Sequence, residues 1–335
     1  MDLSPILNPL NDPQRTAVTA PVGPVLVLAG AGSGKTRVLT HRIAWLIQTG
    51  DASAYSVLAV TFTNKAAAEM RARVEKLLGV PGGALWLGTF HGIAHRLLRL
   101  HWREAGLVQS FQILDAEDQL RVIKKLLKAQ NLDESRWIPR DIQYFINKHK
   151  DEGRRPQHLR SGADAAEAQL LKLYAQYEET CARTGVIDFA ELLLRAYELW
   201  RDQPQLLEHY RTRFRHVLVD EFQDTNAIQY AWIRLLVGAQ GAPFVVGDDD
   251  QSIYRWRGAR VENLHQFRED FPHAQLYRLE QNYRSSGSIL EAANALIANN
   301  SGRLGKTLWT SGARGEPVRD AVEGAEPERA AGYAE

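Results

Sequence analysis

The stretch VLVLAGAGSGKTRVL, which runs from Val25 to Leu39, limits the possible folds of this chain more than any other segment. Its apolar, branched start is typical of a buried strand in a parallel sheet, and apolar residues recur at helical spacing after Arg37. A turn of small residues lies between the two and ends in Gly34, Lys35 and Thr36. A strand, a glycine-rich turn and a helix in this order predict a βαβ unit whose turn can bind phosphate.

The turn contains the residue types that phosphate binding requires. Its glycines lack a Cβ, so the backbone can wrap around a phosphate with its N–H groups pointing inward. We expect Lys35 to reach the β- and γ-phosphates of a nucleotide and the Thr36 hydroxyl to bind Mg²⁺. Ala29 occupies the first glycine position of the usual G-x-x-x-x-G-K-[ST] pattern, which is tolerable if this residue keeps a negative φ. The predicted nucleotide-binding residues of the stretch are Ala29, Gly30, Ala31, Gly32, Ser33, Gly34, Lys35 and Thr36.

A second apolar run, in HVLVDEFQDT, ends in Asp220 and Glu221. Parallel sheets bind ligands at the carboxyl ends of their strands, so both carboxylates should lie near the phosphate turn. Asp220 is expected to hold Mg²⁺, and Glu221 to act as the general base that orients and deprotonates the attacking water. Two solvated acids at a strand end are the simpler alternative. The phosphate turn favours the catalytic interpretation, because a base beside the metal ligand is typical of a hydrolase.

A third strand-like run, PFVVGDDDQSIYRWRGA, combines acidic, amide and aromatic residues. We expect Gln251 to face the γ-phosphate, and Tyr254, Trp256 and Arg257 to project into a neighbouring groove. Aromatic side chains interleaved with arginine are typical of single-stranded nucleic acid binding, through base stacking and phosphate contact. Taken alone, the aromatic residues could equally belong to the core.

Strand-like and helical segments are unevenly distributed along the 335 residues, a length that allows two or more domains. The alternation typical of a parallel sheet covers residues 1–90 and returns at 213–280, whereas 91–212 shows only helical spacing. The sequence therefore predicts one α/β domain interrupted by a helical insertion. A basic run in this insertion, NKHKDEGRRPQHLR, is equally consistent with a solvated face and with a surface that flanks DNA.

Charge and cysteine content set weaker limits. The net charge of +1 argues neither for nor against nucleic acid binding, because basic residues can be confined to one groove. One cysteine, Cys181, rules out an internal disulfide and fits a reducing compartment. The N-terminus lacks a basic region ahead of an apolar core, and no apolar run approaches the ~20 residues of a membrane span. We therefore expect a cytoplasmic protein with no membrane association.

Taken together, the ordered motifs LNDPQRTAV, AGAGSGKT, VTFTNKAAAEM, GTFHG, VDEFQDT, GDDDQSIYRWRGA and LEQNYRS resemble the UvrD/Rep/PcrA family of superfamily 1 DNA helicases. The resemblance covers about residues 8 to 312. It implies a RecA-like P-loop domain (domain 1A), interrupted by a helical domain (1B) and followed by the start of a second RecA-like domain (2A) from residue 281. Members of this family commonly have alanine at the position of Ala29.

The resemblance also implies roles for individual residues. Gln14 would recognise the adenine edge, Arg37 would lie against the base or ribose, and Tyr283 would stack on the adenine. Arg284 would reach the γ-phosphate as an arginine finger and join Lys35 and the other catalytic groups. The residues implied to line single-stranded DNA are Thr61, Phe62, Asn64, Thr89, Phe90, His91, Tyr254, Trp256 and Arg257.

The function that the resemblance implies is ATP- and Mg²⁺-dependent movement along single-stranded DNA, 3′ to 5′, and action at junctions between single and double strands. DNA repair, nucleoid association, contacts with repair proteins, and a monomer or weak self-association would follow.

Family members continue for several hundred further residues. The chain is therefore expected to be an N-terminal fragment, with an incomplete second domain at 281–335 and a poorly structured tail. A module that binds ATP and single-stranded DNA without unwinding is the alternative, and the motor of a helicase–nuclease is a third possibility.

Overall fold

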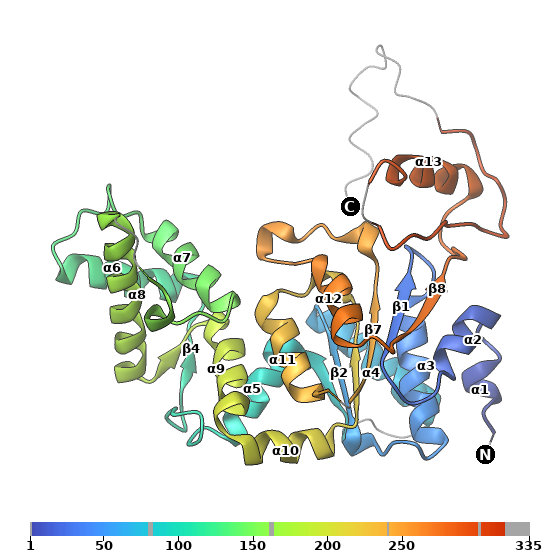
Figure 1. Ribbon diagram of the computed structural model, residues 1–335, viewed down its shortest axis with the longest axis horizontal. Helices are drawn as coiled ribbons and strands as arrows, with labels where there is room; N and C mark the ends of the chain where they lie inside the picture. The colour runs from blue at the N-terminus through green and yellow to red at the C-terminus, as the bar shows by residue number, and fades with distance from the viewer. Residues whose placement is uncertain (1, 80–82, 161–163, 240, 301–302, 319–335) are drawn as a thin grey trace, which may run out of the picture.

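The computed structural model describes residues 2–79, 83–160, 164–239, 241–300 and 303–318. Its centre is a six-stranded parallel sheet with the strand order β3-β2-β6-β7-β1-β8 (Figure 1). The strands are β1 (Val25–Ala29), β2 (Val57–Thr61), β3 (Trp86–Thr89), β6 (His216–Val219), β7 (Ala242–Gly247) and β8 (Gln275–Leu279). The predicted α/β fold with a parallel sheet is confirmed.

Both faces of the sheet are buried, which explains the nearly continuous apolar runs of its strands. In β1, Val25 and Val27 face one hydrophobic cluster, and Leu26 and Leu28 face another. The first cluster includes residues of α2 (Asp12–Val18), α3 (Lys35–Gln48) and α4 (Asn64–Leu78). The second includes residues of α5 (Phe90–Leu100), α9 (Phe189–Asp202), α10 (Pro204–Arg213), α11 (Ala227–Val237) and α12 (Glu262–Asp270). The phosphate turn and the acidic pair are thus fixed by two cores.

Three helices stand apart from the sheet, on the left of Figure 1, and we call them the helical lobe. They are α6 (Ala116–Ala129), α7 (Pro139–Asp151) and α8 (Ala165–Thr184). These helices share a cluster of their own that includes Ile123, Ile146 and Tyr174. The region predicted to lack strands also contains a two-stranded parallel sheet of two-residue strands, β4 (Gln112–Ile113) and β5 (Val186–Ile187). Helices α5, α9 and α10 also fall almost entirely within residues 91–212, but they pack on the large sheet. The boundaries of the helical insertion at residues 91 and 212 therefore stay a prediction.

The basic run of the helical lobe is not a solvated face throughout. Lys148 and Arg154 are exposed, but Lys150 and Arg155 are buried, with exposed fractions of 2% and 5%. Both expected surface roles are therefore wrong for Lys150 and Arg155. The sequence pattern could not show this, because the carboxylates that pair with Arg155 lie 23 to 43 residues away along the chain.

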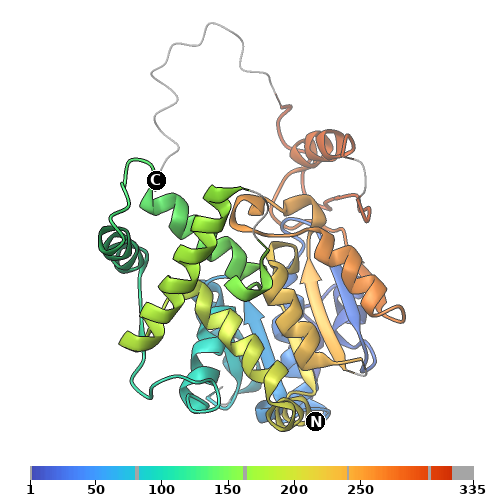
Figure 2. The same ribbon diagram turned by 60° about the vertical axis from the view of Figure 1, so that its left-hand side comes forward.

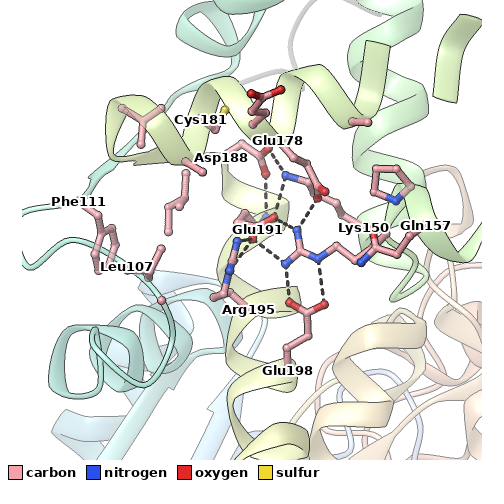
Figure 3. Close-up of a pocket in the computed structure, with 18 of the residues that line it drawn as sticks. Leu107, Phe111, Lys150, Gln157, Glu178, Cys181, Asp188, Glu191, Arg195 and Glu198 are labelled. Carbon is pink, nitrogen blue, oxygen red and sulfur yellow. Dashed lines mark hydrogen bonds and ion pairs between the residues drawn. The ribbon is translucent and has the colours of Figure 1, made fainter. Parts of the chain in front are cut away.

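The buried cations bind carboxylates of α8 and α9 beside a cavity of about 950 Å³ (Figure 3). Lys150 Nζ lies 2.6 Å from Asp188 Oδ2 and 2.9 Å from Glu191 Oε2. Arg155 donates to Glu191 over 2.7 and 2.8 Å and to Glu198 over 2.9 Å. Glu191 therefore lies among three cations, since Arg195 also pairs with it, and they hold the pKa of its carboxyl below the usual range although burial opposes this. The network joins the helical lobe to α9.

The chain then leaves the sheet through β8 and forms what we call the C-terminal arm, the described residues from 280 to 318. It contains α13 (Gly287–Ile297), which lies beyond the upper ends of β1 and β8 in Figure 1 and stands apart from the helices on the sheet in Figure 2. An isolated bridge pairs Gln281 with Trp309. Most of the tail that was expected to be poorly structured lies outside the described residues.

The remaining elements are short. They are α1 (Ser4–Leu7) and the 3₁₀ turns η1 (Ala54–Ser56), η2 (Pro156–His158), η3 (Phe222–Asp224), η4 (Asp249–Gln251) and η5 (Arg255–Arg257). Within the described part of the chain, no helix has the length and apolar character needed to cross a bilayer.

Candidate functional site

The phosphate turn joins β1 to α3 at the carboxyl edge of the sheet. Ala29 is the last residue of β1, fully buried, and it is not among the residues with positive φ. Gly32 and Gly34 take the left-handed conformation, with φ of 66° and 91°. The Ser33 hydroxyl donates to the Gly30 carbonyl over 2.7 Å and closes the turn. The first amides of α3 have no partner within the helix and are available to an anion.

The acidic pair after β6 meets the start of α3. Lys35 Nζ lies 2.9 Å from Glu221 Oε2, and Thr36 Oγ1 donates to Asp220 Oδ2 over 3.2 Å. Asp220 is buried, and this burial, together with the charge of Glu221, raises the pKa of the Asp220 carboxyl to about 7. The structure thus brings together the four side chains that were predicted to bind phosphate and Mg²⁺ and to activate water.

Glu221 has an unusual backbone conformation for a residue with a side chain, with a φ of 49°. Such conformations cost of order 1–3 kcal/mol and persist where the surroundings fix them. Here Gln223, which is buried, donates from Nε2 to Glu221 Oε2 over 2.8 Å. Gln223 was not singled out from the sequence, although it lies within the VDEFQDT motif. It orients the carboxylate that was predicted to be the general base.

The predicted adenine-binding residues lie around the N-terminal end of α2. Gln14 is buried, and its Nε2 donates to the Ser33 carbonyl over 2.8 Å. Asn11 Nδ2 donates to the Tyr283 hydroxyl over 2.7 Å. Arg37 is exposed, and one of its guanidinium nitrogens lies 3.5 Å from the Pro9 carbonyl oxygen. Gln14 therefore connects this region to the phosphate turn.

The C-terminal arm contacts the phosphate turn directly. Asn282 Nδ2 donates to the Ala31 carbonyl over 2.6 Å, and the Tyr283 amide donates to the Gly32 carbonyl over 3.0 Å. A Cβ added at Gly32 would collide with the Cβ of Arg284. Arg284 thus begins beside the turn, and its side chain is exposed. The arm binds carbonyl groups of the turn and leaves amide groups for a ligand.

Gln251 follows β7, the strand between β6 and β1. Its amide nitrogen donates to Asp248 Oδ2. Asp248 is buried, and its own backbone amide donates to Gln223 Oε1 over 2.9 Å. One hydrogen-bonded chain therefore runs from Gln251 through Asp248 and Gln223 to Glu221.

The donor set fits a nucleotide with a divalent cation. Lys35 Nζ is buried and makes no directed hydrogen bond, although Glu221 lies within ion-pair distance. A buried ammonium in this state suits a polyanion, and the amides at the start of α3 can bind one. The Thr36 hydroxyl and the Asp220 carboxylate are oxygen ligands of the kind that Mg²⁺ prefers.

A groove of about 520 Å³ opens near the ends of β2 and β3. The predicted DNA-binding residues that line it are Thr61, Phe62, Asn64, Thr89, Phe90, His91 and Tyr254. The rings of Phe62 and Tyr254 stack with centroids 5.1 Å apart. Phe90 is largely buried and packs edge-on against Trp232, so it borders the groove from the core. These residues come from three separate motifs, and the fold places them around one space.

The groove has further residues that the sequence did not indicate. Phe189, at the start of α9, is 57% exposed, and its ring centroid lies 4.4 Å from that of His91. The Thr61 hydroxyl and Asp224 Oδ1 are buried without hydrogen-bond partners. Burial, and then the charge of Glu221, raises the pKa of the Asp224 carboxyl to about 6. An exposed aromatic ring beside unpaired polar atoms suits a planar ligand that can stack on the ring and form hydrogen bonds along its edge.

Trp256 lies in an adjoining groove of about 520 Å³ and is 75% exposed. Asn147, Asp151 and Asn226 line both grooves and connect them. The placement of the Arg257 side chain lies outside what the structure describes. Trp256 is thus a surface residue, which excludes the alternative that it belongs to the core.

A phosphate turn after β1 and an acidic pair after β6, on a parallel sheet covered on both faces, define a P-loop fold. Residues 10–272 match the model of the UvrD/REP helicase N-terminal domain, and the chain belongs to this family.

Named relatives agree with this assignment. DNA helicase II of Escherichia coli K12 is 63% identical over 318 residues, which are 95% of this chain and 44% of the relative. DNA helicase II of Haemophilus influenzae Rd is 58% identical, with the same coverage of each chain. The ATP-dependent DNA helicase PcrA of Staphylococcus aureus NCTC 8325 is 44% identical over 94% of this chain and 43% of its own length. The chain thus spans less than half the length of these relatives.

Proposed function

We propose that this chain is the ATP-binding and DNA-binding part of a helicase motor that moves 3′ to 5′ along single-stranded DNA. One observation carries the proposal. The phosphate turn and the acidic pair lie at one edge of the sheet. At the same edge the chain runs from strand β7 through Gln251 to Tyr254, which lines the groove near the ends of β2 and β3. A chemical change at the turn therefore has a short physical route to the groove.

In the proposed reaction, ATP lies on the turn with Lys35 at its β- and γ-phosphates. Thr36 and Asp220 would hold Mg²⁺, which neutralises charge on the phosphates and polarises them when bound. Glu221, oriented by Gln223, accepts the proton of the attacking water. Arg284, fixed beside Gly32, stabilises the negative charge that develops on the transferred phosphate.

Single-stranded DNA would occupy the two connected grooves. Bases stack on exposed aromatic rings, a contact worth ~1–3 kcal/mol per base. Phe189 and Trp256 provide such rings, the half-buried Tyr254 lines the same space, and unpaired buried oxygens such as Thr61 Oγ1 can meet base or sugar edges. Double strands at a junction would lie outside these grooves.

DNA repair at the nucleoid of the cytoplasm is the proposed setting, which the resemblance of the motifs to the UvrD/Rep/PcrA family implies. Closure of the C-terminal arm and the phosphate turn around ATP, and their opening after hydrolysis, would move the chain along one strand. The second candidate, a module that binds ATP and single-stranded DNA without unwinding, is favoured by the exposed apolar side chains of α13, including Ile289 and Leu296.

The test compares the purified chain with a fusion that continues it with the C-terminal part of the E. coli relative. We expect the chain alone to bind Mg²⁺–ATP and single-stranded DNA, with little DNA-stimulated hydrolysis and no strand separation. We expect the fusion to hydrolyse ATP and to unwind a 3′-tailed duplex in preference to a 5′-tailed one. A Lys35→Ala variant of each protein controls for contaminating enzymes. Absence of ATP binding by the unsubstituted chain would refute the proposal.

A further inference from the structure

Lys306, in the C-terminal arm, lies among three consecutive aspartates that follow β7. Its Nζ is 2.6 Å from Asp248 Oδ1, 2.7 Å from Asp249 Oδ1 and 2.7 Å from Asp250 Oδ2. Only 2% of the Lys306 side chain is exposed. Burial alone would lower the pKa of Lys306, but the three carboxylates raise it above its usual value. The ammonium therefore stays charged where it is buried.

The aspartates do not form an empty cation site. Their oxygens lie close enough together to hold a metal ion, but the ammonium of Lys306 already lies among them and offsets part of their charge. Without a cation, three adjacent carboxylates with little access to solvent would repel one another strongly. The positive charge that this strand end requires thus comes from a distant part of the chain.

Asp248 connects Lys306 to the proposed catalytic groups. One carboxylate oxygen of Asp248 contacts Lys306, and the other accepts a hydrogen bond from the Gln251 amide nitrogen. The backbone amide of Asp248 donates to Gln223, which in turn orients Glu221. Lys306 therefore reaches the predicted γ-phosphate contact through the carboxylate of Asp248, and the predicted general base through the backbone amide of the same residue.

A second set of contacts fastens the same segment but bypasses Asp248. Arg303 donates to both oxygens of Asp250 over 2.7 and 2.6 Å. The Leu304 amide donates to Asp249 Oδ2 over 2.7 Å. Arg303 and Lys306 thus attach one segment to one strand end, but only Lys306 contacts the carboxylate that holds Gln251. This difference provides a matched pair of variants.

We propose that Lys306 is a positioning residue of the nucleotide site, which holds Asp248 and through it the Gln251 amide in the geometry that distinguishes ATP from ADP. The inference rests on the proposed function and goes beyond it, because it makes γ-phosphate sensing depend on the C-terminal arm. A bidentate or charge-assisted contact fixes an amide rotamer that would otherwise turn freely.

The test is calorimetric titration of the chain with a non-hydrolysable ATP analogue and with ADP, in the presence of Mg²⁺. We expect Lys306→Met to weaken binding of the ATP analogue about 10-fold or more, the usual effect of losing one hydrogen bond to a charged group, and to leave ADP binding nearly unchanged. Lys306→Arg should restore most of the preference. Arg303→Met, the matched control, should change the ratio of the two affinities less than Lys306→Met does.

A double variant tests whether Lys306 acts through Gln251. Gln251→Ala should abolish the preference for the ATP analogue, and adding Lys306→Met should reduce it no further. If Lys306→Met fails to fold, Asp248→Asn breaks the same link from the other side and should give the same loss. A chain that binds no nucleotide refutes the proposed function. A chain that prefers the ATP analogue and keeps that preference in Lys306→Met refutes only the role of Lys306.

Discussion

The two sides of the nucleotide site are built in different ways. Lys35, Asp220 and Glu221 follow strands whose residues are all buried between two hydrophobic clusters. We call these three residues the sheet arm. The C-terminal arm has little core of its own, and its large apolar side chains Ile289 and Leu296 are 52% and 75% exposed. Its attachment to the sheet depends largely on hydrogen bonds and ion pairs.

Because the two sides are held by different forces, we expect them to control different properties of the site. Packing fixes the sheet arm whether or not a ligand is bound, so it should determine whether phosphate binds at all. Polar contacts such as those of Asn282 and Lys306 hold the C-terminal arm. A segment with few buried apolar contacts can open locally while the rest of the protein stays folded. We therefore expect the sheet arm to provide the affinity for the ligand, and the C-terminal arm to change its position with the ligand that is bound.

The largest expected effect is on the sheet arm. Glu221→Gln should lower ATP turnover by roughly two or more orders of magnitude and leave binding of Mg²⁺–ATP largely intact, because the proposed metal ligand Asp220 stays while the proposed base is lost. Steady-state hydrolysis with saturating single-stranded DNA measures the turnover, in the fusion with the E. coli relative.

Lys35→Ala provides the contrast within the same arm, since it should weaken ATP binding itself. If turnover of Glu221→Gln stays within a few-fold of the parent, Glu221 is not the base. The sheet arm would then not provide the base for hydrolysis, and this difference between the two arms would be wrong.

The sequence indicated those parts of the site that depend on short-range patterns. The phosphate turn and the acidic pair each lie within a few residues of one strand, so residue type and order sufficed. Phe189 was missed because an exposed phenylalanine at the start of a helix has no local signature. Lys306 was missed because its partners lie far away in sequence, with 57 residues separating it from Asp249.

The same limit explains the error in the helical lobe. Lys150 and Arg155 occur in a polar run that local pattern assigns to the surface, but carboxylates of α8 and α9 compensate them in the interior. Only the tertiary fold brings these charges together. A buried cation is thus invisible to any analysis that considers one segment at a time.

A smaller effect is expected in the two connected grooves, whose described lining comes from the elements of the large sheet and from the helical lobe and includes no residue of the C-terminal arm. Trp256→Ala and Phe189→Ala should each weaken single-stranded DNA binding by about 1–3 kcal/mol if a base stacks on the ring. Fluorescence anisotropy with a labelled oligonucleotide measures the affinity. Arg284→Ala, in the C-terminal arm, should change it little.

Equal losses in Trp256→Ala and Arg284→Ala would contradict the comparison, because DNA binding would then need both arms. An unchanged affinity in a folded Trp256→Ala variant would show that this exposed ring does not contact DNA.

The most local effects should appear within α13, and they should leave the nucleotide site and the sheet unchanged. Leu290 is 4% exposed and Leu296 is 75% exposed on the same helix. Truncating a buried leucine costs ~2–5 kcal/mol, whereas an exposed one usually changes stability by less than about 0.5 kcal/mol. If the C-terminal arm opens by itself, Leu290→Ala should speed hydrogen exchange of α13 amides and leave the amides of β1 as slow as before, while Leu296→Ala should change neither. Faster exchange in β1 as well would mean that the C-terminal arm and the sheet unfold as one unit.

This distinction matters for the fusion protein, in which Leu296 is expected to contact the added sequence. In the fusion protein, Leu296→Ala should therefore lower the stability of α13. The difference between its effect in the fusion protein and its effect in the chain alone measures how much packing, in place of polar contacts, holds the segment that contains Arg284.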